Sequence, residues 1–263
     1  MKYQHHADSV EKLSVKLRED PEVLALVLAG SVAKGVEKPD SDLDVFVVLA
    51  DEKHARLAAE CRLSVCDYEN CAYESGYFDI KHLTLGQLRA VAERGSEPAR
   101  DAWTKARCVF SRVTEIGELI PKIAVFREEE RAEKMLSFYS AFTLNVNYYW
   151  HESGGNAYLR ARSAADIVLF AYRMMLQEAG VLFSCHKSLE AQIAALPEKP
   201  DGILAKSGRL LTEQSNAAKE DSELTVKAFV KYAPPADFNV VLSRYAEDNE
   251  WWWYKTRPII TEW

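Results

Sequence analysis

Residues 24–49 read LALVLAGSVAKGVEKPDSDLDVFVVL. The apolar run at residues 23–29 ends at Gly30, which indicates a buried strand rather than a helix. Gly30 and Ser31 then turn the chain into a short predicted helix, and backbone N–H groups at such a strand-to-helix junction can hold a phosphate. A Pro-Asp-Ser turn follows, and residues 42–49 form a second predicted apolar strand.

Two carboxylates, Asp42 and Asp44, interrupt the second strand. Side chains two apart on a strand lie on the same face, with about 6.5–7 Å between their Cα atoms. Two like charges this close repel each other unless a cation lies between them, and Mg²⁺ takes one or two carboxylates together with substrate phosphate oxygens. The pattern therefore predicts a phosphoryl-transfer site. The alternative is a surface turn followed by a strand whose acidic residues face solvent.

Gly30-Ser31, a spacer at residues 32–41 and Asp42-Leu43-Asp44 together resemble the motif of the nucleotidyltransferases related to DNA polymerase β. That family carries a third carboxylate on a later strand, and Asp79 in the predicted strand at residues 77–84 is the position that matches. The resemblance implies that Asp42, Asp44 and Asp79 hold two Mg²⁺ ions. It also implies that Asp79 acts as the general base, or at least supplies the field that helps to deprotonate the attacking hydroxyl. The alternative for Asp79 is an ordinary surface pair with Lys81.

The same resemblance implies a nucleoside triphosphate as co-substrate, with ATP as the expected one. Lys34 stands three residues after Ser31, where relatives often place a basic residue against the phosphates. His186-Lys187-Ser188 is similar to a lysine motif in the antibiotic-modifying members, although a solvent-exposed lysine is the alternative for Lys187. The expected nucleotide-binding residues are Gly30, Ser31, Lys34, Ser41 and Lys187.

The remaining pattern divides the chain at about residue 125. Before it, predicted strands alternate with predicted helices, which indicates a mixed sheet with flanking helices. Ser9 is the expected N-cap of a first helix at 9–19. The other elements expected there besides those above are helices at 52–60 and 85–94, an edge strand and loop within 62–74, a strand at 106–111, and a helix at 116–124 interrupted early by Pro121. After it, we expect helices at 127–152, 157–179, 189–196, 203–220, 222–232 and 238–254.

We therefore predict an α+β fold with a catalytic nucleotidyltransferase domain at residues 1–125 and an all-helical bundle domain at residues 126–263. This combination resembles the kanamycin and lincosamide nucleotidyltransferases, which implies that the helical domain helps to bind the acceptor. The aromatic run at residues 251–254 predicts core packing or an interface more than stacking on a base or sugar.

Composition limits the partners. The formal net charge of −7 gives no overall basic field for a nucleic-acid backbone. No apolar run approaches the ~20 residues of a transmembrane helix, and the N-terminal residues lack a signal-peptide core, so a cytoplasmic protein without membrane contact is expected. The five cysteines are an odd number, and we expect them to be free thiols.

The expected reaction is transfer of a nucleoside monophosphate from a Mg-NTP to a hydroxyl of a small molecule, aminoglycoside- or lincosamide-like, with release of pyrophosphate. Two alternatives stay open. One is a protein nucleotidylyltransferase of the antitoxin type, and the other is a non-catalytic nucleotide sensor on the same fold. The sequence leaves the acceptor, the preferred base and a homodimer open.

Overall fold

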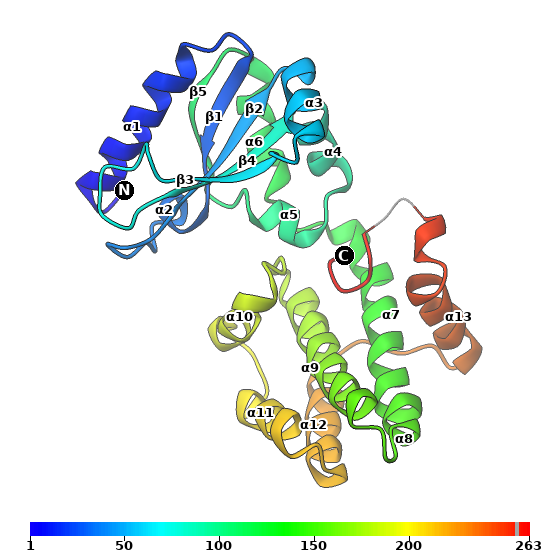
Figure 1. The fold of residues 1–263 in the computed structure, drawn as a ribbon. Coiled ribbons are helices and arrows are strands. Elements are labelled where there is room, and N and C mark those ends of the chain that lie inside the picture. Colours follow the sequence, from blue (N-terminus) through cyan, green and yellow to red (C-terminus); the bar gives the residue numbers. More distant parts are fainter. Residues whose placement is uncertain (256–257) are drawn as a thin grey trace. The chain divides into compact units, whose positions relative to one another are not determined.

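The structure, a computed structural model, describes residues 1–255 and 258–263. The chain forms two compact units, Met1–Val125 and Phe126–Trp263, which we call the N-terminal unit and the helical unit. Figure 1 shows the sheet in the N-terminal unit and the long helices α7 (Glu128–Leu144) and α9 (Ala157–Ala179) in the helical unit. No helix in the described part of the chain is long and apolar enough to cross a bilayer.

The N-terminal unit is built on a five-stranded sheet in the order β3-β4-β2-β1-β5. Only the central pair β2 and β4 is parallel, and the other neighbours are antiparallel, so the sheet is mixed, as predicted. Its strands are β1 (Val23–Leu28), β2 (Leu43–Leu49), β3 (Ser64–Asp67), β4 (Phe78–Thr84) and β5 (Arg107–Ser111). Its helices are α1 (Gln4–Arg18), α2 (Gly30–Lys34), α3 (Asp51–Ala59), α4 (Leu85–Arg94), α5 (Glu97–Asp101) and α6 (Thr114–Ile123).

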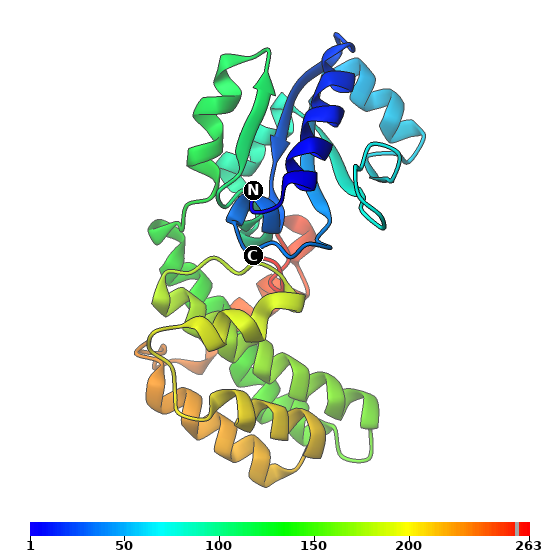
Figure 2. The same cartoon turned by 90° about the vertical axis from the view of Figure 1, so that its left-hand side faces the viewer.

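The two faces of this sheet carry separate apolar cores, as the two-residue period of the strands requires. On one face Leu43 and Val45 of β2 pack with Leu13 of α1. On the other face Val48 of β2 packs with Leu88 of α4, and α6 adds to the same cluster. Figure 2 shows α1 and α6 on different sides of the strands. The second face also carries the acidic residues of β2 and β4, so the helices around it decide what the site contains.

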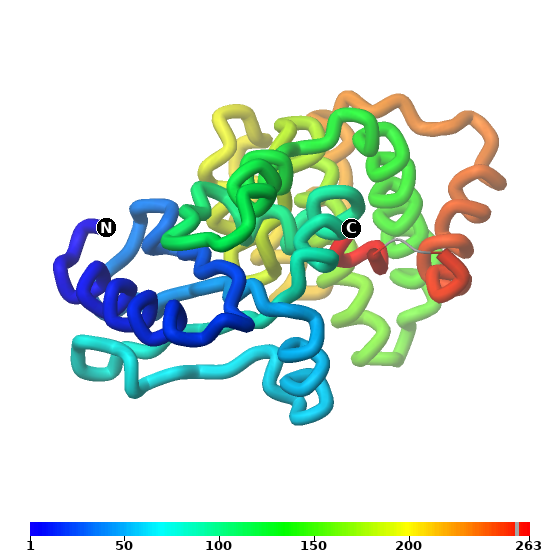
Figure 3. Tube along the Cα trace, turned by 90° about the horizontal axis from the view of Figure 1, so that it is seen from above, coloured from blue at the N-terminus to red at the C-terminus, as the bar shows by residue number. Residues whose placement is uncertain are grey.

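The loop between β3 and β4 lies along α1, as Figure 3 shows. Ser9 joins them, because its hydroxyl donates to the carbonyl of His5 at 2.7 Å and accepts from the backbone N–H of Ala72 at 2.9 Å. This contact corrects the predicted start of the first helix. Ser9 is not an N-cap but an internal residue of α1, which begins at Gln4.

Two further predictions in the N-terminal unit have a clear outcome, and one helix of this unit was not predicted. The ambiguous segment after α3 contains the edge strand β3, in line with its prediction. The helix at 116–124 is not interrupted at Pro121: α6 runs from Thr114 to Ile123, and the fully buried Ile116 and Ile123 anchor it on both sides of the proline. Helix α5 was not expected at all. Ser96 caps it by accepting from the N–H of Ala99, and a proline stands in its first turn.

The helical unit is organised on the pair α7 (Glu128–Leu144) and α9 (Ala157–Ala179), with α13 against α7 and the hairpin α11–α12 beside α9. Its core is rich in Phe, Met and Leu side chains from these helices. The bounds of α9 are those predicted, because Asn156 caps its start and Gly180 ends it in the left-handed conformation. The other elements are η1 (Asn145–Tyr149), α8 (Trp150–Glu152), η2 (His186–Ser188), α10 (Leu189–Ala195), α11 (Ile203–Glu213), α12 (Asn216–Phe229), α13 (Phe238–Asn249) and η3 (Trp252–Tyr254).

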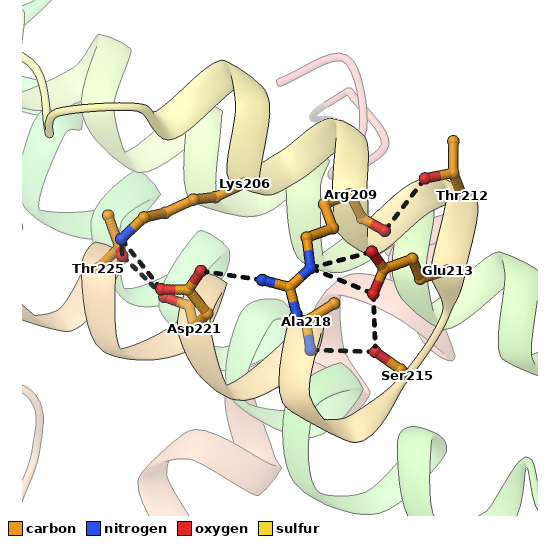
Figure 4. Close-up of polar contacts among 8 residues, drawn as sticks. All are labelled: Lys206, Arg209, Thr212, Glu213, Ser215, Ala218, Asp221 and Thr225. Atoms are coloured by element: carbon orange, nitrogen blue, oxygen red, sulfur yellow. Dashed lines mark hydrogen bonds and ion pairs between the residues drawn. The ribbon is translucent and has the colours of Figure 1, made fainter.

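Three helix predictions in this unit are wrong in part. The single helix expected at 127–152 contains a π-helical segment, Asn145–Tyr149. The break expected after residue 220 lies instead at Gln214–Ser215, where Gln214 is left-handed (φ 50°) and Ser215 caps α12. An exposed ion-pair network of Arg209, Glu213 and Asp221 spans this hairpin (Figure 4). The helix expected at 238–254 ends at Asn249.

The aromatic run at residues 251–254 does not pack in a core. Trp251, Trp252 and Trp253 are 55%, 45% and 69% exposed, and Tyr254 is 81% exposed. Consecutive residues of a short 3₁₀ turn point in different directions, so one core cannot take them all. The cysteine prediction is confirmed, since all five cysteines are free.

Candidate active site

The glycine-serine turn and the second aspartate of the motif, Asp44, meet in the N-terminal unit. Gly30 follows β1 with φ +64°, in the left-handed region that glycine adopts readily. A Cβ at this residue would stand 1.7 Å from Asp44 Oδ2, so the carboxylate lies directly against the glycine. The N–H of Ala29 also donates to the carbonyl of Asp44 at 2.9 Å, which fixes the two strands at this point.

Ser31 is the next residue, and its hydroxyl is buried with no hydrogen-bond partner in the described part of the chain. A buried hydroxyl without a partner costs free energy, so natural proteins rarely leave one unless a ligand or water satisfies it. Together with Gly30, which lets a ligand approach the backbone, this unpartnered hydroxyl donor is suited to bind a phosphate oxygen.

Asp44 and Asp79 are paired residues of the parallel strands β2 and β4. Both line a cavity of about 200 Å³ together with Gly30, Phe46 and Lys81. The register alone brings the predicted third carboxylate beside the second one. Asp79 is therefore on the same face of the sheet and at the same level as Asp44.

Asp42 directly precedes β2 and stands two residues before Asp44, with the buried Leu43 between them facing the opposite core. Strand alternation gives the two aspartates the same face. The hydroxyl of Tyr77 donates to Asp42 Oδ2 at 3.0 Å, and this hydrogen bond raises the pKa of Tyr77 to about 12. Tyr77 therefore stays a neutral donor that orients the carboxylate.

The three aspartates do not form a closed metal cage. In residues 1–255 and 258–263, no group of three or more His, Cys, Asp or Glu side chains is arranged to hold a metal ion. Mg²⁺ bound to nucleotides commonly takes only one or two carboxylates and completes its shell with phosphate oxygens and water. The carboxylates at the cavity are therefore suited to bind a Mg²⁺ ion that is already coordinated by a triphosphate.

Comparison with known proteins fits this geometry. Residues 10–131, which include the turn and all three aspartates, match the family model described as nucleotidyltransferase domain. Residues 10–131 form a nucleotidyltransferase domain. A search of curated protein sequences finds no match to the chain.

Two solved structures align with most of the chain at low similarity. A nucleotidyltransferase-like protein from Exiguobacterium sibiricum 255-15 is 11% identical with a TM-score of 0.43, and the alignment covers 96% of this chain and 81% of that one. Spectinomycin adenyltransferase AAD(9) from Enterococcus faecialis, solved with ATP and spectinomycin, is 14% identical with a TM-score of 0.34 over 90% and 96% of the two chains. At these scores neither alignment carries an argument about function.

The remaining predicted nucleotide-binding residues of the nucleotidyltransferase domain have protein partners. Lys34 Nζ lies 2.8 Å from Asp101 Oδ2 and so ties α2 to α5. The hydroxyl of Ser41 accepts from the N–H of Lys38 at 2.9 Å within the turn before β2. Lys187 lies outside this domain, on η2 of the helical unit, and is exposed.

Two polar residues of the site have no signal in the sequence motif, Tyr77 and Lys81. Lys81 Nζ donates to both carboxylate oxygens of Asp79 at 3.0 Å, so the surface pair that was the alternative for Asp79 is present in this structure. Asp79 is nevertheless a wall residue of the cavity that contains Asp44. In this nucleotidyltransferase domain the pair therefore lies at the site rather than away from it. A two-residue spacing on a strand was the only available sign of Lys81.

Proposed function

We propose that this protein transfers a nucleoside monophosphate from a Mg-NTP, with ATP as the expected donor, to a hydroxyl of a small-molecule acceptor and releases pyrophosphate. The observation that carries the proposal is the register of β2 and β4, which sets Asp44 beside Asp79 in a cavity bordered by Gly30. Membership of residues 10–131 in the nucleotidyltransferase family supports the reaction class.

In this proposal Gly30 and Ser31 bind the triphosphate. The glycine lets the phosphates approach the backbone, and the unpartnered Ser31 hydroxyl donates to a phosphate oxygen. Lys34 would exchange Asp101 for phosphate, since the Lys34 side chain is 28% exposed and the pair is within reach of solvent. Ser41 would act through the turn that orders Asp42.

Asp42, Asp44 and Asp79 would hold two Mg²⁺ ions, which supply charge neutralisation at the phosphates when bound. The chain's own contribution is orientation: Tyr77 holds Asp42, and the contact with Gly30 holds Asp44. Asp79 would accept the proton of the acceptor hydroxyl. The hydroxyl oxygen then bonds to the α-phosphorus as the bond to pyrophosphate breaks, and positioning and charge stabilisation carry most of the catalysis.

The helical unit, residues 126–263, would contribute to binding of the acceptor, which in the proposal is aminoglycoside- or lincosamide-like. This assignment and that of Lys187 as a triphosphate ligand rest on the resemblance of the chain to the antibiotic nucleotidyltransferases. A cytoplasmic location fits a reaction that consumes a nucleoside triphosphate.

Pyrophosphate release tests the proposal. The purified protein is incubated with each of the four nucleoside triphosphates, Mg²⁺ and a panel of aminoglycosides and lincosamides, and the products are weighed by mass spectrometry. We expect one class of acceptor to gain one nucleoside monophosphate. The Asp42→Asn/Asp44→Asn double variant is the control and should give no product. Binding of the triphosphate without turnover would favour the alternative of a non-catalytic nucleotide sensor. Attachment of the nucleoside monophosphate to this chain or to an added protein would favour the antitoxin-type protein nucleotidylyltransferase.

A further inference from the structure

A second cavity of the N-terminal unit, about 680 Å³ in volume, adjoins the carboxylate cavity. The two share Phe46, Lys81 and Ala102 as wall residues. Its walls come from β2, β4, α4, α5 and the residues that directly follow α4 and α5. Its volume is within the range of pockets that bind small molecules.

The inner wall of this second cavity is apolar and rigid. Phe46 and Trp103 stack with ring centroids 4.3 Å apart and ring planes within 4° of each other. Trp103 is only 3% exposed and Leu83 is 9% exposed, so the core holds both in place. Val91 of α4 lines the cavity from the side. An apolar body that fills this cavity would remove these side chains from water, at about 25 cal/mol per Å² of apolar area.

The charged residues of the second cavity are cationic. Lys81 and Arg94 line it, and no carboxylate is among its described wall residues. Lys81 is paired with Asp79 at 3.0 Å, so the cationic character of the wall rests mainly on Arg94. His82 also contributes, but burial lowers its pKa, and one ring nitrogen, Nδ1, already faces the carbonyl of Arg62 at 3.0 Å. A polycation would therefore meet like charge here, whereas a neutral or anionic molecule would not.

The in-line geometry of nucleotidyl transfer indicates which molecule the second cavity would bind. Attacking and leaving oxygens lie roughly in line across the transferred phosphorus. With the triphosphate at Gly30 and Ser31, pyrophosphate leaves toward α2, so the attacking hydroxyl must come from the Asp79 side of Asp44. The second cavity shares Lys81, two residues after Asp79 on β4, with the carboxylate cavity. It therefore adjoins the Asp79 side, as an acceptor site must.

We propose that the second cavity binds the apolar body of the acceptor, and that the acceptor is a hydroxyl compound with such an apolar body rather than a polycation. This inference rests on the proposed function and narrows its acceptor class. A cationic acceptor of the aminoglycoside kind would have to avoid the cavity.

The probe for a test is 8-anilinonaphthalene-1-sulfonate, an apolar anion that fluoresces when removed from water. Ala90 of α4 lines the cavity, so Ala90→Phe should fill it. Ala55 of α3 is exposed, so Ala55→Phe is the matched control for an added phenyl ring. We expect Ala90→Phe to weaken probe binding at least tenfold, or about 1.4 kcal/mol, with Ala55→Phe unchanged. Mg-ATP binding by calorimetry should stay within about twofold in both variants.

Two competition experiments test which molecule binds in the second cavity and which charge it carries. Mg-ATP should not displace the probe from the wild-type protein, and displacement would make the cavity a nucleobase site and overturn the inference. Naphthalene-1-sulfonate should displace the probe at least tenfold better than 1-naphthylmethylamine, and the reverse order would overturn the charge preference.

Equal probe binding in Ala90→Phe would also overturn the inference, because the probe would then bind elsewhere, such as the exposed aromatic run at residues 251–254. If Ala90→Phe fails to fold, Ala99→Leu on the α5 wall takes its place with the same expected result. A wild-type protein that binds no Mg-ATP would refute the proposed function and this inference with it. Intact Mg-ATP binding without a saturable probe site would refute the inference alone.

Discussion

Gly30 and Asp44 are in such close contact that a Cβ on Gly30 would stand 1.7 Å from Asp44 Oδ2. The residue expected to receive the phosphates and the residue expected to bind the metal are therefore packed against each other. No side chain can be added at Gly30 unless the Asp44 carboxylate or the backbone moves. Glycine is therefore required here both by the contact with Asp44 and by the φ of +64°.

Gly30→Ala should reduce Mg-ATP affinity at least tenfold, because the methyl group displaces the Asp44 carboxylate. Gly35→Ala is the matched control. Gly35 also has positive φ, at +75°, but a Cβ there meets nothing within 4 Å. Both variants carry left-handed strain of about 1–2 kcal/mol, and only the first disturbs the site. Calorimetric titration with Mg-ATP measures the difference, and wild-type affinity in Gly30→Ala would place the phosphates elsewhere.

Asp79→Asn should lower kcat on the order of 10²- to 10⁴-fold with little change in Mg-ATP affinity, because the near-isosteric amide cannot accept the acceptor proton. A purely structural pair with Lys81, whose side chain is 52% exposed, would instead be worth at most ~1 kcal/mol of stability and would leave turnover intact. Slow hydrolysis of the triphosphate by water provides the assay. Lys81→Met is the control, since it removes the pair but keeps the carboxylate. Equal turnover in wild type and Asp79→Asn would leave the general base unassigned.

Tyr77→Phe should lower the free energy of unfolding by roughly 0.5–1 kcal/mol at pH 8, because Asp42 loses a hydrogen bond on a half-exposed surface. The pKa of Tyr77 is raised to about 12 from an ordinary value of 10.0. Its stabilising effect is therefore complete below pH 10 and is lost as the pH rises through 12. Urea unfolding of both proteins from pH 8 to 12 should show their difference vanish over that range. A difference that persists at pH 12 would show that Tyr77 acts by packing.

Arg173→Leu should destabilise the helical unit by about 2–4 kcal/mol, since it leaves main-chain oxygens without their donor. Arg173 is 0% exposed and donates to the main-chain oxygens of Thr261 and Trp263 at 2.6 and 2.7 Å. It also lies against the rings of Phe138 and Phe183. Urea unfolding followed by far-ultraviolet circular dichroism measures the loss.

Arg209→Leu is the matched control for that experiment. Arg209 pairs with Glu213 and Asp221 on the surface of α11 and α12 (Figure 4), and its side chain is 43% exposed. Such a pair is worth less than about 1 kcal/mol. Similar losses in the two variants would mean that burial does not distinguish the two arginines.

The sequence by itself determined the elements whose causes are local. The apolar run before Gly30 and the alternation across Asp42 and Asp44 are enough to predict β1 and β2. The cap at Asn156 and the glycine at residue 180 fix both ends of α9. In each case neighbouring residues contain the information, because backbone conformation, capping and strand alternation act over a few residues.

Only the tertiary structure decided what surrounds these elements. The pairing of Asp44 with Asp79 depends on the register of two strands that are distant in sequence, and so does the presence of Lys81 beside the site. The sequence pattern predicts Ser9 as a helix cap, but in the structure its hydroxyl accepts a hydrogen bond from the backbone N–H of Ala72. The second cavity exists because Trp103 follows α5 and stacks on Phe46. Such contacts are selected by packing across the whole unit, and a pattern that is read along the chain does not contain them.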